Sequence, residues 1–163
     1  MNNQSKSRIL GIILLAWLAV IGFDFVLHAS LLAPLYAEPD PFLLPPLRAF
    51  TLIPLGYLSF LILVILLVWL MTRLQIATWK NGFVFGLKLG SLLWGALVLS
   101  LLSITPAPAL LMLAWFVGQT IELGIAGLVA GAGFGASGLK KLVLWVILFF
   151  LVCFVTGIIL QNL

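Results

Sequence analysis

Lys88 and Glu122 are ionisable residues inside long apolar runs, where a charge is costly. Each lies 17 residues from Thr105, which begins a proline-rich turn at 105–108. Because a helix rises about 1.5 Å per residue, two helices joined by this turn would hold both side chains at a similar depth. A lone charge near the centre of a bilayer costs at least about 2.5 kcal/mol. We therefore expect Lys88 and Glu122 to form a buried ion pair.

Two other interpretations of these residues remain open. Gln119 shares a helical face with Glu122, so Lys88, Glu122 and Gln119 could instead line a path for a proton or a small solute. Alternatively, the long Lys88 side chain reaches the nearby membrane surface and leaves Glu122 protonated. The polar stripe around each residue stops halfway along its run, which favours a local contact over a path through the membrane.

Asp24, His28 and Arg48 form a second candidate group. Asp24 and His28 are four residues apart, so both project from one face of a helix. Arg48 would begin the next span at a comparable height, and His28 would titrate near neutral pH. We expect a structural hydrogen-bond network here in preference to a catalytic or metal site, because paired ionisable groups often have structural roles.

Motifs for catalysis, metals and cofactors are missing from the sequence. It has one His and one Cys, Cys153, which are too few for a metal cluster with recognisable spacing or for paired haem ligands. Residues 133–138 match G-x-G-x-x-G, but they follow a membrane helix and no strand, so the match is accidental. A P-loop, H-E-x-x-H and G-x-S-x-G are absent. We predict no metal and no cofactor, assign no catalytic residue and favour a non-enzyme.

The elements that must position these residues are membrane-spanning helices. Of the 163 residues, 64% are hydrophobic and only 7% are charged, against about 25% charged in a soluble domain. The apolar runs are continuous and do not alternate, which excludes a transmembrane barrel. We predict a single all-α membrane domain, a polytopic bundle of five spans, with four also possible, at 9–28, 50–71, 83–103, 109–130 and 142–160.

Basic residues predict the orientation of this bundle. With the amino terminus in the cytoplasm and the carboxyl terminus outside, Arg48 is the one basic connecting residue on the outer side, as the positive-inside rule requires. Because the basic residues are scattered, the net charge of +4 indicates topology signals and no nucleic-acid partner. We expect a multi-pass protein of a bacterial inner membrane, surrounded by lipid, with a membrane-protein partner or a second copy of the chain.

The two connections that flank the candidate residues differ in character. Residues 29–49 contain five prolines, which prevent a continuous helix, yet the segment is apolar. We expect it to lie on the outer interface or to cap the bundle. The turn 105–108 is short, so the third and fourth spans should form an antiparallel hairpin. Gly86-x-x-x-Gly90 and Gly127-x-x-x-Gly131 are positions where helices can approach closely.

Residues 23–36, with Asp24 and His28 near the end of the first span and Tyr36 after an apolar segment, resemble a group of small bacterial multi-pass membrane proteins of unknown function. Residues 81–86 and the span that contains Gln119 are similar to the same group. The resemblance implies a membrane bundle, usually of four spans. It implies no activity, substrate or cofactor.

Three functions fit the sequence. The first is a non-enzymatic accessory or structural membrane protein that contains a buried Lys88–Glu122 pair, because no soluble domain and no catalytic signature are present. The second is a small transporter or proton-coupled channel that uses Lys88, Glu122 and Gln119. The third is a membrane enzyme that acts on a lipid or quinone at the outer interface, with His28 as acid or base and Asp24 orienting it.

Overall fold

The computed structural model describes residues 5–37, 40–135 and 138–162. These residues form helices and no strand: α1 (Lys6–Val26), the π-helix η1 (Leu27–Leu31), α2 (Ala33–Ala37), α3 (Pro46–Arg73), α4 (Trp79–Ile104), α5 (Ala109–Phe134) and α6 (Leu139–Gln161). Five helical segments, with α1 and η1 taken as one, are long and apolar enough to cross a membrane. The predicted all-α bundle of five spans is therefore confirmed, whereas its orientation stays a prediction.

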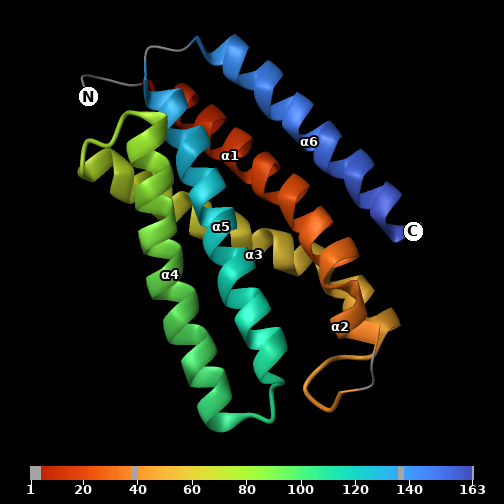
Figure 1. Ribbon diagram of the computed structural model, residues 1–163. Coiled ribbons are helices and arrows are strands. Elements are labelled where there is room, and N and C mark those ends of the chain that lie inside the picture. Colours follow the sequence, from red (N-terminus) through yellow and green to blue (C-terminus); the bar gives the residue numbers. More distant parts are fainter. Residues whose placement is uncertain (1–4, 38–39, 136–137, 163) are drawn as a thin grey trace.

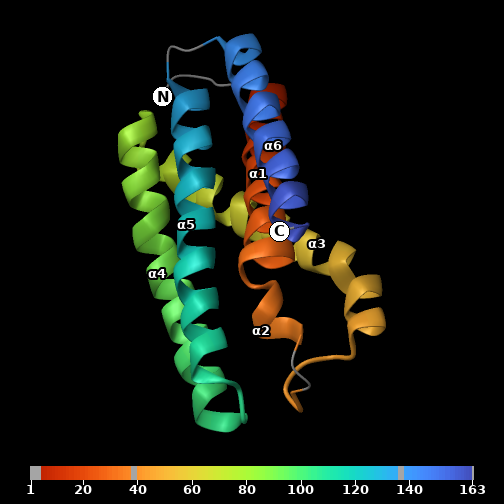
Figure 2. The same ribbon diagram turned by 45° about the vertical axis from the view of Figure 1, so that its right-hand side comes forward.

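Helix α5 is the central element of the bundle (Figure 1). It forms an antiparallel hairpin with α4 and also contacts α1, α3 and α6. Helices α1 and α6 lie side by side in both views, and α3 crosses the bundle obliquely (Figure 2). Most buried residues in the described part of the chain belong to α5 and α1. The buried polar groups Asp24, Gln119 and Glu122 on these two helices therefore lie in the interior of the protein.

Hydrogen bonds fix the position of α1 along α5. Arg8, at the start of α1, donates to the carbonyl oxygens of Gly133 and Gly135 at the end of α5, at 2.9 and 3.2 Å. The two helices are therefore antiparallel. Asp24 follows Arg8 by 16 residues and Gln119 precedes Gly133 by 14, so the two side chains come to a similar depth in the bundle.

Glycines let α4 and α5 approach closely. A Cβ atom added at Gly82 would collide with the backbone of Gly127, and one added at Gly86 would collide with the carbonyl oxygen of Leu123. The predicted hairpin and its small-residue contact are thus present. This contact also orients α4, because the face that carries Gly82 and Gly86 must point at α5.

The proline-rich segment is shorter than predicted and partly helical. η1 extends the first helix, α2 adds five residues, and α3 begins at Pro46 instead of at residue 50. Proline is favoured in the first turn of a helix because no partner is needed there for its missing N–H. Tyr36 and Phe42 pack against a small cluster that contains Leu111. The described part of this segment therefore covers the end of the bundle where α4 turns into α5.

Candidate functional site

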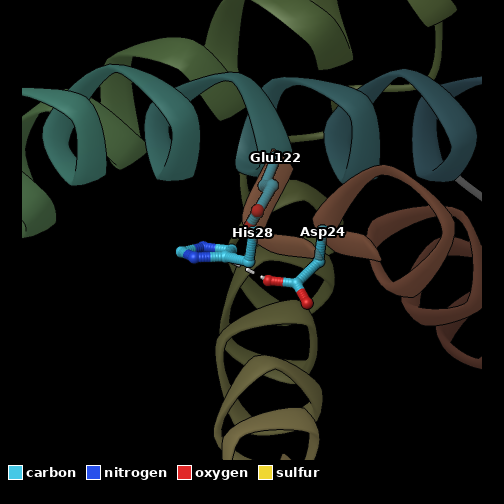
Figure 3. A group of neighbouring side chains, drawn as sticks. All are labelled: Asp24, His28 and Glu122. Atoms are coloured by element: carbon cyan, nitrogen blue, oxygen red, sulfur yellow. Dashed lines mark ion pairs between the residues drawn. The ribbon is translucent and has the colours of Figure 1, made fainter. Parts of the chain in front are cut away.

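The structure joins members of the two candidate groups into one cluster. Asp24 projects from α1 and His28 from η1, and Glu122 points toward them from α5 (Figure 3). Polar atoms of the three side chains lie within 4.8 Å of one another. Gln119, one turn before Glu122, contacts His28 as well. The cluster therefore contains two carboxyl groups, an imidazole and an amide.

The local sequence explains why the first helix and α5 come so close at this point. Gly118 directly precedes Gln119, and a Cβ atom at Gly118 would collide with the side chain of Leu27. Leu27 begins the π-turn, in which the N–H of Leu32 donates to the Leu27 carbonyl at 2.8 Å. Single π-turns within helices often occur at functional sites. Gly118 and the π-turn thus bring His28 against Gln119.

His28 is the centre of a chain of hydrogen bonds. Its Nδ1 lies 2.6 Å from the hydroxyl oxygen of Tyr36, and the indole N–H of Trp115 donates to that oxygen at 2.7 Å. Its Nε2 lies 3.0 Å from Nε2 of Gln119 and 3.5 Å from Oδ1 of Asp24. The imidazole therefore connects α2 with both the first helix and α5.

The protons of this chain have two consistent arrangements. If the Gln119 amide nitrogen donates to Nε2 of His28, then Nδ1 carries the ring proton and donates to Tyr36. If the amide is turned so that its oxygen faces Nε2, Tyr36 donates to Nδ1 and Nε2 donates to the amide. Burial raises the pKa of Tyr36 to about 12, so its hydroxyl keeps its proton at neutral pH. His28 can thus relay a proton between the side facing Tyr36 and the side facing Asp24.

Glu122 is the most deeply buried group of the cluster. Only 1% of its surface is exposed. Neither of its carboxyl oxygens has a hydrogen-bond partner among the residues that the structure describes. Burial of an unpartnered carboxylate is costly because it loses its hydration. Glu122 therefore requires either a proton or a cation.

The predicted ion pair between Lys88 and Glu122 is wrong. In the described part of the chain no ion pair joins them, and Lys88 is exposed on α4. Gly86 and Gly90 face α5, and Lys88 lies halfway between them. Two residues turn a helix by about 200°, so Lys88 points away from α5. The prediction matched the depths of the two residues, and depth does not fix which face of a helix meets its neighbour.

Arg48 also lies outside the cluster. The structure gives Asp24 an ion-pair contact with His28 and, within the described ranges, with no other basic residue. Arg48 is exposed in the first turn of α3, which starts away from α1 in Figure 2 because α3 crosses the bundle obliquely. The predicted group of Asp24, His28 and Arg48 thus keeps its first two members and loses its guanidinium.

A pocket of about 310 Å³ gives access to the cluster. Asp24, His28 and Gln119 line it, together with residues of α3 and α4. We call it the polar pocket. A cavity of about 10 Å³, lined by Glu122 and Gln119, lies next to it. This small cavity shares Phe60, Trp94 and Gln119 with the polar pocket.

An apolar groove of about 550 Å³ adjoins the polar pocket. The two spaces share Ile53, Gly56 and Trp115. The other residues that line the groove come from α2, from the connection to α3 and from α3 itself: Tyr36, Phe42, Leu43, Leu44, Pro46, Ala49 and Leu52. Among the described residues, no Lys or Arg lines either space.

Comparisons with known proteins supply neither a family nor a function. The chain matches no protein-family model, no curated protein and no solved structure. The resemblance carried by residues 23–36 therefore stays a prediction.

Two members of the site, Tyr36 and Trp115, were not among the predicted site residues. Trp115 precedes Gln119 by four residues, so the polar face of α5 could have been extended to it by helical spacing. Tyr36 had a weaker signal, since a tyrosine in an apolar segment commonly lies at a membrane interface. Its contact with His28 depends on the fold of residues 29–37, which no spacing rule predicts.

Proposed function

We propose that this chain is a multi-pass protein of a bacterial inner membrane that binds a neutral amphipathic molecule of the quinone or isoprenoid-alcohol class. The observation that carries the proposal is the apolar groove that continues into the polar pocket at Asp24, His28 and Gln119. The groove takes the apolar chain of the ligand. The carbonyl or hydroxyl head reaches His28.

The charges around the polar pocket favour a neutral head over a phosphate. Asp24 and Glu122 are the acidic groups of the cluster, and the exposed Lys88 and Arg48 do not line the pocket. A phosphate would thus be placed beside carboxyl groups without a compensating cation, which is costly in a dry site. A carbonyl or hydroxyl head needs only hydrogen bonds, which the imidazole and amide can supply.

In this proposal His28 exchanges a proton with the bound head. It lines the polar pocket, and its hydrogen bond with Tyr36 gives it a neighbour that can donate or accept. Asp24, at 3.5 Å, orients the ring. General acid–base chemistry by a histidine requires this combination of access and positioning.

The two other functions have less support. A transport path would have to continue beyond Glu122, where Leu67, Ala126 and Val64 belong to a closely packed apolar core. An accessory role was motivated in part by a Lys88–Glu122 pair, which does not form. Neither role accounts for a groove that ends in polar side chains.

Blocking the groove tests the proposal. Gly56 lines both pockets, and a Cβ atom added there has nothing within 4 Å, so Gly56→Phe places a ring at the passage between them and its Cβ meets no neighbour. We expect mass spectrometry of the protein, extracted with its native lipids into nanodiscs, to show one amphipathic molecule retained near one per chain. Gly56→Phe should reduce its retention about tenfold, which corresponds to about 1.4 kcal/mol.

The matched control is Leu55→Phe, which adds an aromatic ring at the adjacent, exposed position outside both pockets. It should retain the ligand as the parent protein does. The proposal fails if the parent retains no such molecule, if the retained molecule carries a phosphate head, or if the two variants behave alike.

A further inference from the structure

We infer that Asp24, His28 and Glu122 bind one divalent transition-metal ion, with Zn²⁺ as the ion to test. The three side chains offer one imidazole nitrogen and two carboxylates within 4.8 Å of one another, on two helices (Figure 3). This mixed set suits Zn²⁺, Mn²⁺ and Fe²⁺, whereas Ca²⁺ and Mg²⁺ prefer oxygen ligands alone. The site shares Asp24 and His28 with the polar pocket, so the proton exchange and the charge balance described above apply to the protein without this ion.

The distances lie close to those of a metal site. Around an ion with bonds of about 2.1 Å, tetrahedral ligand atoms are about 3.4 Å apart. His28 Nε2 and Asp24 Oδ1 are already separated by 3.5 Å. The Glu122 carboxylate must approach them, and its side chain has rotatable bonds with which to do so.

Glu122 supplies an independent reason to expect a cation. Its side chain is 1% exposed and points at Asp24 and His28 (Figure 3). Its two oxygens lack hydrogen-bond partners in the part of the chain that is described. A dication balances the charges of two carboxylates, so Asp24, Glu122 and the ion together are neutral. This arrangement removes the cost of burying an unpartnered charge.

The surroundings of His28 are those of a metal-binding imidazole. Histidine ligands commonly use their second ring nitrogen in a hydrogen bond that fixes the ring. Here Nδ1 bonds to Tyr36 at 2.6 Å, and Trp115 holds the Tyr36 hydroxyl from the other side. Nε2 is left facing Asp24. The ion takes the Nε2 lone pair in place of the Gln119 amide.

Three protein ligands leave a coordination position open. Zinc sites of this kind hold a water molecule there, whereas purely structural zinc sites have four protein ligands. Asp24 and His28 line the polar pocket, so the open position is on the side from which a small molecule arrives. The ion would lower the pKa of a water bound there.

Direct metal binding tests this inference without any assay of function. The protein is purified in detergent without a polyhistidine tag, stripped with a chelator and titrated with Zn²⁺, and bound metal is counted by elemental mass spectrometry. We expect one ion per chain. We also expect a raised unfolding midpoint, and a visible absorption spectrum of low-symmetry coordination when Co²⁺ replaces Zn²⁺. Glu122→Gln and Asp24→Asn should each weaken Zn²⁺ binding at least about tenfold.

The control variant is Asp40→Asn, which removes a carboxylate that bonds to the Phe42 N–H outside the cluster. It should bind Zn²⁺ as the parent does. Less than one ion per parent chain, unchanged affinity in Glu122→Gln, or an equal loss in Asp40→Asn would overturn the inference. Gly56→Phe separates the two proposals, because it blocks the groove and leaves the three ligands in place. It should retain the ion.

Discussion

His28 receives contacts from three elements: Asp24 on its own helix, Gln119 on α5 and Tyr36 on α2. Tyr36 in turn accepts the Trp115 indole N–H. Each of these groups is partly or fully buried, so the loss of one partner leaves another without a hydrogen bond. The site is thus a connected network whose members depend on each other.

Removal of the Tyr36 hydroxyl tests this dependence. Tyr36→Phe leaves the Trp115 N–H without its acceptor and should lower the free energy of unfolding by about 1–3 kcal/mol. Trp115→Phe breaks the same hydrogen bond. The loss of unfolding free energy in the double variant Tyr36→Phe, Trp115→Phe should therefore be smaller than the summed losses of the two single variants, by at least about 0.5 kcal/mol. The free energy of unfolding in detergent is measured for the parent, the two single variants and the double variant. Strictly additive losses would contradict the hydrogen bond between Trp115 and Tyr36.

Lys88 should be dispensable for stability. It is exposed on α4 and has no ion-pair contact with Glu122, so Lys88→Met removes a charge from an exposed helix face. We expect the free energy of unfolding to change by less than about 0.5 kcal/mol or to increase. Removing one partner of a buried ion pair would instead lower the free energy of unfolding by about 3–5 kcal/mol. If Lys88→Met lost that much stability in the same unfolding assay, the result would contradict the structure and favour a Lys88–Glu122 ion pair.

Spacing predicted part of the site. The shared faces of Asp24 with His28, and of Gln119 with Glu122, follow from helical periodicity within one helix. That these two faces meet depends on which helices are neighbours, and periodicity does not contain that information. Lys88 shows this limit, because its position along the hairpin follows from the sequence, whereas the direction of its side chain, away from α5, does not.

At the scale of elements, the contact between α4 and α5 is the most sensitive to substitution. Gly86→Ala would place a methyl group against the carbonyl of Leu123 and force the helices apart. We expect a loss of about 1–3 kcal/mol, as for overpacking of a core. Gly56→Ala is the control, since its Cβ enters open space and alanine is favoured over glycine in a helix. Equal unfolding midpoints for the two variants would argue against a close contact.

The five spans were predictable because each must supply an apolar stretch of about 20 residues. Their ends were less so. Hydropathy does not show that α3 starts at Pro46 or that the first helix continues through a π-turn to Leu31. These details depend on local capping and on contacts such as the one between Leu27 and Gly118. The candidate site lies at this π-turn, which contains His28.

At the scale of the whole molecule, an odd number of spans places the two termini on opposite sides of a membrane. The positive-inside pattern predicts that the carboxyl terminus is outside. Alkaline phosphatase fused after the last residue should therefore be active in bacterial cells, and a green fluorescent protein in the same place should stay dark. A fusion after Gly135, the residue that caps the carboxyl end of α5, should reverse both signals. If the two fusion sites gave the opposite signals, the carboxyl terminus would be in the cytoplasm and the predicted orientation would be wrong.

The oblique course of α3 makes the site sensitive to the thickness of the bilayer. Its 28 residues extend about 42 Å at 1.5 Å per residue, and a helix longer than the roughly 30 Å hydrocarbon layer must tilt. Because α3 forms one wall of the groove, a change in its tilt changes the width of the entrance. Ligand retention should therefore differ between nanodiscs of short-chain and long-chain lipids. The membrane would then act as a regulator of the protein it contains.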